Sequence, residues 1–282
     1  MSSSATPSST KIPPPPPAIS SSGGARTAGR DELLQPPGFL VGVRLIAGRE
    51  LAAYFDSAIA YVFTVAFVVL ANSIFMNEFF LAGNVDMSAF FDQLPLLLAF
   101  FLPAITMRLW AEERKQRTIE FLLTLPISPL QAILGKYMAA LGLFGMFLLG
   151  SLPIPIMLAA LGSPDVGLIC SGYLGLFAFG AMFLAFGMFL SALSGDQIVA
   201  FVLSTILGFF FVLSGNDQVA AVLDGLFPAA GAGTFLYENV SALPHYDAFV
   251  RGLVELSSLV YFGLSSALFL WANSLVLERN RA

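Results

Sequence analysis

Six apolar runs of roughly membrane-spanning length dominate this chain. They cover residues 57–76, 94–110, 130–161, 166–193, 198–213 and 256–277. A helix needs about 20 predominantly apolar residues to cross a bilayer. Only 11% of the 282 residues are charged, whereas a soluble domain has about 25%. We therefore predict an all-α polytopic membrane protein with six transmembrane helices. The over-long third run contains Pro153 and Pro155, which predict a kink.

The basic residues predict the orientation of these spans. With six spans, 12 of the 13 Lys and Arg residues fall on one side of the membrane. They precede the first run, lie around the loop between the second and third runs, or follow the sixth run, and only Arg251 falls on the other side. Cytoplasmic loops carry an excess of basic residues. We expect a multi-pass protein of the cytoplasmic (inner) membrane, with both termini and the central loop in the cytoplasm.

The first 56 residues divide into two segments. Residues 1–37 are rich in Ser and Pro, with five consecutive prolines at 13–17. Such a composition buries too little apolar surface to fold, and we expect a disordered cytoplasmic tail, with a ligand for proline-binding domains as the alternative. Residues 38–56 predict an amphipathic helix in the membrane interface, with an early extension of the first span as the alternative. Its apolar face is predicted to hold Leu40, Val43, Ile46, Ala47, Leu51 and Tyr54.

Residues 214–255, between the fifth and sixth runs, contain too many charges and prolines for a span. We expect one or two short outer helices here, forming a re-entrant segment that dips into the membrane from the outer face. His245, Arg251 and Glu255 are its candidate functional residues. The six-span domain is then residues 57–282.

The loop between the second and third runs concentrates charge and must lie in water, because each such charge costs about 2.5–3.5 kcal/mol at the centre of a membrane helix. Ile119, Leu122 and Leu123 then recur at helical spacing, which predicts a short helix with one apolar stripe that ends at Pro126. Ser128 and Gln131 form a predicted capping box around Pro129, so a new helix begins there.

Two stretches carry a family resemblance. The sequence E-E-R-K-Q-R-T-I-E-F-L-L-T-L-P-I-S, followed by G-K-Y, resembles the first cytoplasmic loop of ABC-2 transporter permeases. The sequence L-P-H-Y-D-A-F-V-R-G-L-V-E-L-S-S-L-V-Y-F resembles the stretch before the last span in the branch that includes gliding-motility and nitrous-oxide-reductase-maturation permeases. The resemblance extends over about residues 39–280, including an amphipathic connecting helix before the first span, and leaves the proline-rich tail unexplained.

The resemblance implies a permease subunit, and export is the expected direction. In this family the loop carries a coupling helix that docks on an ABC ATP-binding subunit, which holds the ATP and Mg²⁺. The implied ATPase-coupling residues are Glu112, Glu113, Arg114, Thr118, Ile119, Glu120, Leu122, Leu123 and Pro126. A second permease subunit, identical or different, is the other implied partner, with the path at their interface in the lipid bilayer. From the residues alone, a helix lying on the lipid surface is an equal alternative.

Signals of catalysis are missing from the sequence. Gly135-Lys136 is followed by Tyr137 rather than Ser or Thr, and the upstream glycine of a phosphate loop is absent. One His and one Cys provide no zinc cluster. We expect no catalytic residue, no metal, no cofactor in this chain and no nucleic-acid partner. The alternative function is an ABC-linked membrane anchor or mechanical transmitter that moves no solute. A third class, an intramembrane enzyme, would need paired carboxylates inside the bilayer.

Overall fold

The computed structural model describes residues 38–83, 86–117, 128–226, 231–239 and 241–279. Within these ranges all regular secondary structure is helical, which confirms the predicted all-α polytopic class. The predicted tail at 1–37 lies outside the described residues, as does the predicted coupling helix at 118–125.

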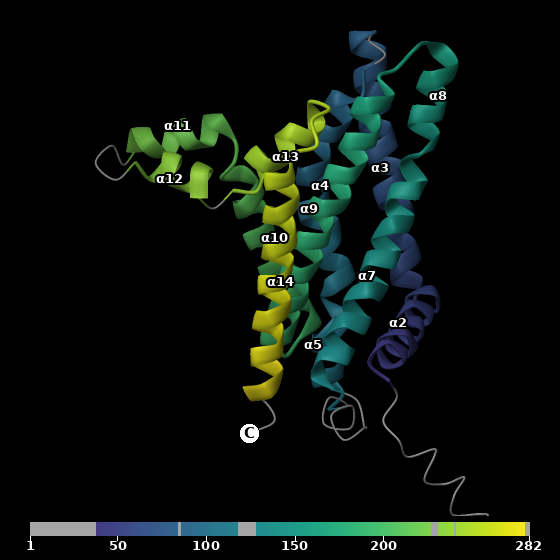
Figure 1. Cartoon of the computed structure of the whole chain (residues 1–282), viewed down its shortest axis with the longest axis vertical. Helices are drawn as coiled ribbons and strands as arrows, with labels where there is room; N and C mark the ends of the chain where they lie inside the picture. Colours follow the sequence, from purple (N-terminus) through teal and green to yellow (C-terminus); the bar gives the residue numbers. More distant parts are fainter. Residues whose placement is uncertain (1–37, 84–85, 118–127, 227–230, 240, 280–282) are drawn as a thin grey trace, which may run out of the picture. The chain divides into compact units, whose positions relative to one another are not determined.

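The elements are α2 (Phe39–Phe55), α3 (Ala58–Ala82), α4 (Ser88–Thr106), α5 (Arg108–Lys115), α7 (Pro129–Ser151), α8 (Pro153–Leu161), α9 (Val166–Leu193), α10 (Gln197–Leu213), α11 (Asp217–Leu226), α12 (Ala232–Asn239), α13 (Leu243–Val250) and α14 (Leu256–Arg279) (Figure 1). The break between α7 and α8 at Leu152 confirms the kink expected before Pro153. The second span starts at Ser88 rather than at the predicted residue 94, because α4 continues through the polar Asp92 and Gln93.

Five helical stretches of the described chain are long and apolar enough to cross a membrane alone. The predicted fifth span, α10, has 17 residues and reaches the required length only together with α11, from which it is bent by 90°. Its two ends nevertheless lie at opposite ends of the bundle. Gln197 shares a surface pocket with Met107, whereas Val212 lines a cavity with Asp92 and Leu243. Thus α10 runs the length of the bundle, which agrees with the predicted total of six spans.

We call the end of the bundle that carries α5 and the start of α7 the loop end, and the opposite end the α13 end (Figure 1). The described residues after α10 form three short helices before α14, rather than the expected one or two. One of the three is α13, whose first turn contains Pro244. A proline is favourable there, because the first N–H groups of a helix have no partner within the helix. The other two, α11 and α12, contact each other. The Asp224 carboxylate joins them by accepting hydrogen bonds from the Gly233 amide (2.6 Å) and the Thr234 hydroxyl (2.7 Å).

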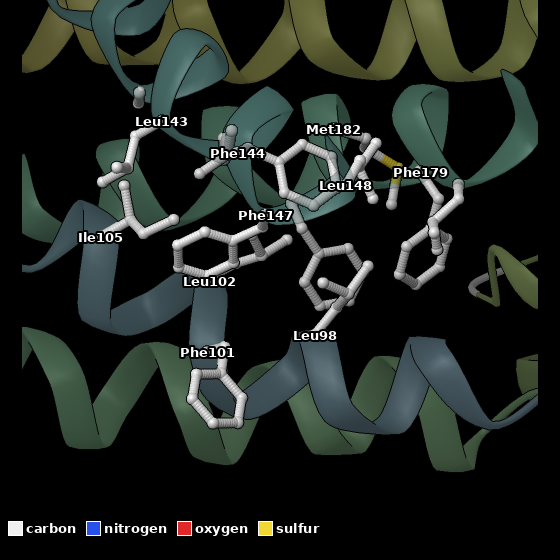
Figure 2. Close-up of a cluster of buried hydrophobic side chains, with 14 of the residues drawn as sticks. Leu98, Phe101, Leu102, Ile105, Leu143, Phe144, Phe147, Leu148, Phe179 and Met182 are labelled. Carbon is white, nitrogen blue, oxygen red and sulfur yellow. The ribbon is translucent and has the colours of Figure 1, made fainter. Parts of the chain in front are cut away.

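Two helices form the centre of the bundle. In the most apolar 18-residue stretch of α4 and of α9, 72% of the residues are buried, compared with 17% in α3 and 11% in α14. Large apolar side chains of α4, α7 and α9 meet between these helices, as Figure 2 shows for Leu98, Phe147 and Phe179. Gly180 allows this approach, because a Cβ there would overlap the ring of Phe144. The outer helices therefore present most of their surface to lipid or to a partner.

A proline inside α4 leaves one carbonyl without its helical hydrogen bond, and a side chain of α13 donates to that carbonyl instead. Pro95 has no N–H, so the carbonyl of Phe91 loses the partner that a regular helix would supply. The buried hydroxyl of Tyr246 donates to this carbonyl at 2.9 Å. Since a buried carbonyl without a partner is costly, this bond fixes α13 against α4.

We predict that Tyr246→Phe destabilises the folded protein by about 1–3 kcal/mol, because the Phe91 carbonyl is left buried without a donor. Thermal unfolding of the purified protein in detergent measures this effect. Tyr61→Phe is the matched control, since Tyr61 is 53% exposed. Equal melting temperatures for wild-type protein and Tyr246→Phe would contradict the assignment.

Candidate functional site

The junction between α4 and α5 leads from the second span into the predicted coupling loop, and a serine from the central helix α9 holds it. The Ser191 hydroxyl donates to the carbonyl of Met107 at 2.9 Å. Its oxygen accepts from the amides of Trp110 and Ala111, each at 3.2 Å. A hydroxyl has one donor and two acceptor sites, so Ser191 uses its full capacity to bridge the break. The start of α5 is thereby fixed to α9.

A tyrosine from α2 holds the other side of the same junction. The buried Tyr54 hydroxyl donates to the carbonyl of Ile105 at 2.8 Å. The guanidinium carbon of Arg108 lies 5.0 Å from the centre of the Tyr54 ring, within the range of a cation–π contact. Consequently α2, the helix before the first span, is bonded directly to the end of the second span.

A buried lysine joins three helices at the loop end. The Lys136 ammonium of α7 lies 3.0 Å from a carboxylate oxygen of Glu50 on α2 and 2.8 Å from one of Glu113 on α5. Arg49 approaches the same two carboxylates at 2.7 and 3.7 Å. The ring of Trp110 lies 5.0 Å from the ammonium. We call these five residues the Lys136 cluster.

The Lys136 cluster balances its charges, with two cations and two carboxylates. The Lys136 side chain is only 2% exposed, and a charge buried to that degree needs partners. Burial alone would raise the pKa of Glu50, but Lys136 and Arg49 outweigh that effect and lower it. The Glu50 carboxylate is therefore expected to be ionised at neutral pH. The cluster couples α2, α5 and α7 electrostatically.

Close packing between α2 and α7 brings Glu50 to Lys136. A Cβ on Gly135 would meet Ile46, and one on Gly42 would meet Gln131, so both glycines are needed for this approach. The predicted apolar face of α2 is only partly covered by other helices of the protein. Ile46 and Tyr54 are buried, but Leu40 is 78% exposed because Gly42 faces α7 instead. The placement of α2 in the membrane interface stays a prediction.

The start of α7 confirms the predicted capping box. The Gln131 amide donates to the Ser128 hydroxyl oxygen at 3.2 Å, and the Ser128 amide donates to Gln131 Oε1 at 2.8 Å. Gln131 Nε2 also donates to the carbonyl of Phe39 at 3.3 Å. The cap therefore both starts the third span and holds the first residue of α2.

An exposed ion pair links α5 to the start of α10. Lys115 Nζ lies 2.9 Å from Asp196 Oδ2, and Asp196 Oδ1 accepts from the Ile198 amide at 2.8 Å. The hydrogen bond from Lys115 is the main reason that the pKa of Asp196 is lowered. Because both side chains are substantially exposed, this pair is worth little compared with the Lys136 cluster.

The structure separates the predicted site residues into three groups. Glu113 belongs to the Lys136 cluster, while Glu112 pairs with Arg108 one turn away at 3.6 Å and Arg114 lies partly exposed on α5. At the α13 end, His245 stacks on Tyr261 with ring centres 4.1 Å apart, and Arg251 and Glu255 are exposed. The remaining coupling residues lie outside the described residues: Thr118, Ile119, Glu120, Leu122, Leu123 and Pro126.

Three residues that organise the loop end were not predicted from the sequence. Lys136 carries a usable signal, because an ionisable residue inside a membrane-spanning run indicates a partner and a function. Glu50 interrupts the apolar pattern of α2, which would make it a candidate partner for Lys136. Ser191 carries no signal, since a serine in an apolar helix is ordinary and its three bonds arise only from packing.

A model of the family described as ABC-2 family transporter protein matches residues 81–275. The chain belongs to the ABC-2 transporter family. It is the multi-pass membrane permease subunit of an ABC transporter, and the family implies a separate ATP-binding subunit as its partner. No curated protein matched the chain. The match includes the central loop and Lys136, whereas α2, which supplies Glu50, precedes it.

We predict that Lys136→Met lowers the free energy of unfolding of the permease by up to about 3–5 kcal/mol, because two largely buried carboxylates then lose their main counter-charge. Lys115→Met is the matched control on α5 and is expected to cost only about 0–1 kcal/mol. Thermal unfolding of both variants in detergent compares them. Similar losses for the two variants would mean that the Lys136 cluster contributes no more than a surface pair.

Proposed function

We propose that this permease is an exporter driven by a separate ATP-binding subunit that docks on residues 112–128. The observation that carries the proposal is that both ends of this loop are anchored in one cluster. Glu113 lies on the α5 side and Lys136 on the α7 side, with 2.8 Å between their charged atoms. A force applied to the loop would therefore reach the second and third spans together.

The bonded junction supports a mechanism in which the spans tilt as a unit. ATP and Mg²⁺ would bind to the partner subunit, and its closure would push on residues 118–125. Since Ser191 and Tyr54 hold the α4–α5 junction, α5 would transmit the push to α4 and α9. The Lys136 cluster would carry it to α7 and α2. Tilting of these helices against a second permease subunit, identical or different, would open a path at their interface.

The distribution of charge supports a cytoplasmic loop end. Among the described residues, every Lys and Arg except Arg251 lies at the loop end. By the excess of basic residues in cytoplasmic segments, we place this end and both termini in the cytoplasm, and the protein in the inner membrane. Residues 243–262 support membership of the gliding-motility and nitrous-oxide-reductase-maturation branch, since they resemble the stretch before its last span.

We predict that Leu122→Asp or Ile119→Asp uncouples the ATP-binding subunit without unfolding the permease. Each apolar side chain at a docking centre contributes about 1.5–3 kcal/mol if it is fully buried, and a carboxylate there adds a charge to desolvate. Co-purification with the ATP-binding subunit and ATPase turnover, compared at equal expression, measure the effect. Glu120→Ala is the neighbouring control and is expected to change both less.

Wild-type association and turnover in Leu122→Asp would contradict docking on this loop. Stimulation of ATPase turnover by a solute would separate the exporter from a membrane anchor or mechanical transmitter, because only a transported solute is expected to raise turnover.

A further inference from the structure

A cavity of about 540 Å³ opens between α3, α4 and α10, toward the α13 end. Its volume falls in the range of about 300–1,000 Å³ that is typical of small-molecule sites. Most of its wall is apolar, and Leu96, Phe100, Phe101 and Phe209 are among the lining residues. We call this cavity the α4–α10 groove.

The polar groups of the α4–α10 groove are confined to one end. Asp92, Gln93 and Asn216 line the end nearest α13, while Phe100 and Phe101 lie about two to three turns further along α4. At about 1.5 Å per residue, Asp92 and Phe101 are about 13 Å apart along the helix axis. A ligand that satisfies both regions must therefore be amphipathic, with its long axis parallel to α4.

The charge at the polar end selects the sign of that ligand. Asp92 is the charged residue in the wall of this groove. The carboxylates of Glu78, Asp86 and Asp247 reinforce its negative potential, and Arg251 opposes it. The negative charges near the polar end outnumber the positive one, so this end favours a cation and would repel an anionic head group.

We propose that the α4–α10 groove binds a drug-sized amphipathic amine. Its protonated nitrogen pairs with Asp92, and its apolar body lies along Phe100 and Phe101. A two-chain phospholipid exceeds this cavity, so the occupant is a single-chain or compact amine. That the amine is the exported cargo rests on the proposed function, whereas its binding to the groove does not.

Photo-crosslinking of the full permease in phosphatidylcholine nanodiscs tests the proposal. The probes are dodecylamine, dodecanol and dodecanoic acid, each with the same diazirine on the alkyl chain. We expect the amine to label α4 and α10 peptides saturably, and about two- to fivefold more tightly than dodecanol. Asp92→Asn should remove this preference and leave dodecanol labelling unchanged.

Two variants serve as controls. Asp92→Glu keeps the charge and should keep the preference for the amine. Asp86→Asn removes a carboxylate outside the groove wall and should weaken amine labelling by less than Asp92→Asn. Equal melting temperatures for all variants exclude misfolding as the cause of any difference.

Equal labelling by the three probes, or an unchanged preference in Asp92→Asn, would overturn the proposal. Competition by a two-chain aminophospholipid at lower concentration than dodecylamine would overturn the assignment to a compact amine. Loss of labelling on addition of a second permease subunit would make the groove a subunit contact instead. If the amine binds but does not stimulate ATP hydrolysis by the ATP-binding subunit, the groove is still an amine-binding site, and only the proposal that the amine is the exported cargo fails.

Discussion

The ammonium of Lys136 is buried between carboxylates from two other helices, and the organisation of the loop end depends on that arrangement. A lysine whose side chain is buried inside a helix bundle, as that of Lys136 is, needs partners of opposite charge. Glu50 and Glu113 provide the pairing at 3.0 and 2.8 Å, and this requirement brings α2 and α5 against α7. Replacing all members of a buried ion cluster together by apolar residues of similar size is often neutral for stability, whereas removing one member alone costs about 3–5 kcal/mol. We therefore interpret the cluster as a connector between helices rather than as a source of stability.

The junction beside the cluster explains how a soluble loop can act on spans that lie in lipid. The helical hydrogen bonds are interrupted at Met107, and the freed groups bond to Ser191 of α9, while Tyr54 of α2 donates to the carbonyl of Ile105 just before the break. A flexible joint at this point would absorb motion before it reached α4. Because α4 and α9 are the most buried of the candidate spans, a displacement of α5 is transmitted to the centre of the bundle. The α4–α10 groove lies along the same helix, toward its opposite end.

Features that depend on local sequence were predicted, and features that depend on distant contacts were not. Length and apolar composition identified the spans. Pro153 marked the kink, and Ser128 with Gln131 marked the start of α7. The beginning of α4 was misplaced because Asp92 sits inside the helix near its end, where a charge is tolerated. Glu50, Glu113 and Lys136 meet only through the fold, so no spacing rule connects them. Ile119 and Leu122 lie outside the described residues, and their coupling role stays a prediction.

The central claim is that Glu113 and Lys136 act as one unit in transmitting force. A double-mutant cycle with Glu113→Gln and Lys136→Met, measured as ATPase turnover of the assembled transporter, tests it most directly. We predict that each single change lowers turnover and that the double variant is no worse than the poorer single variant. The corresponding interaction free energy is expected to be about 1–3 kcal/mol. Independent effects, with the two losses in turnover multiplying in the double variant, would contradict the claim.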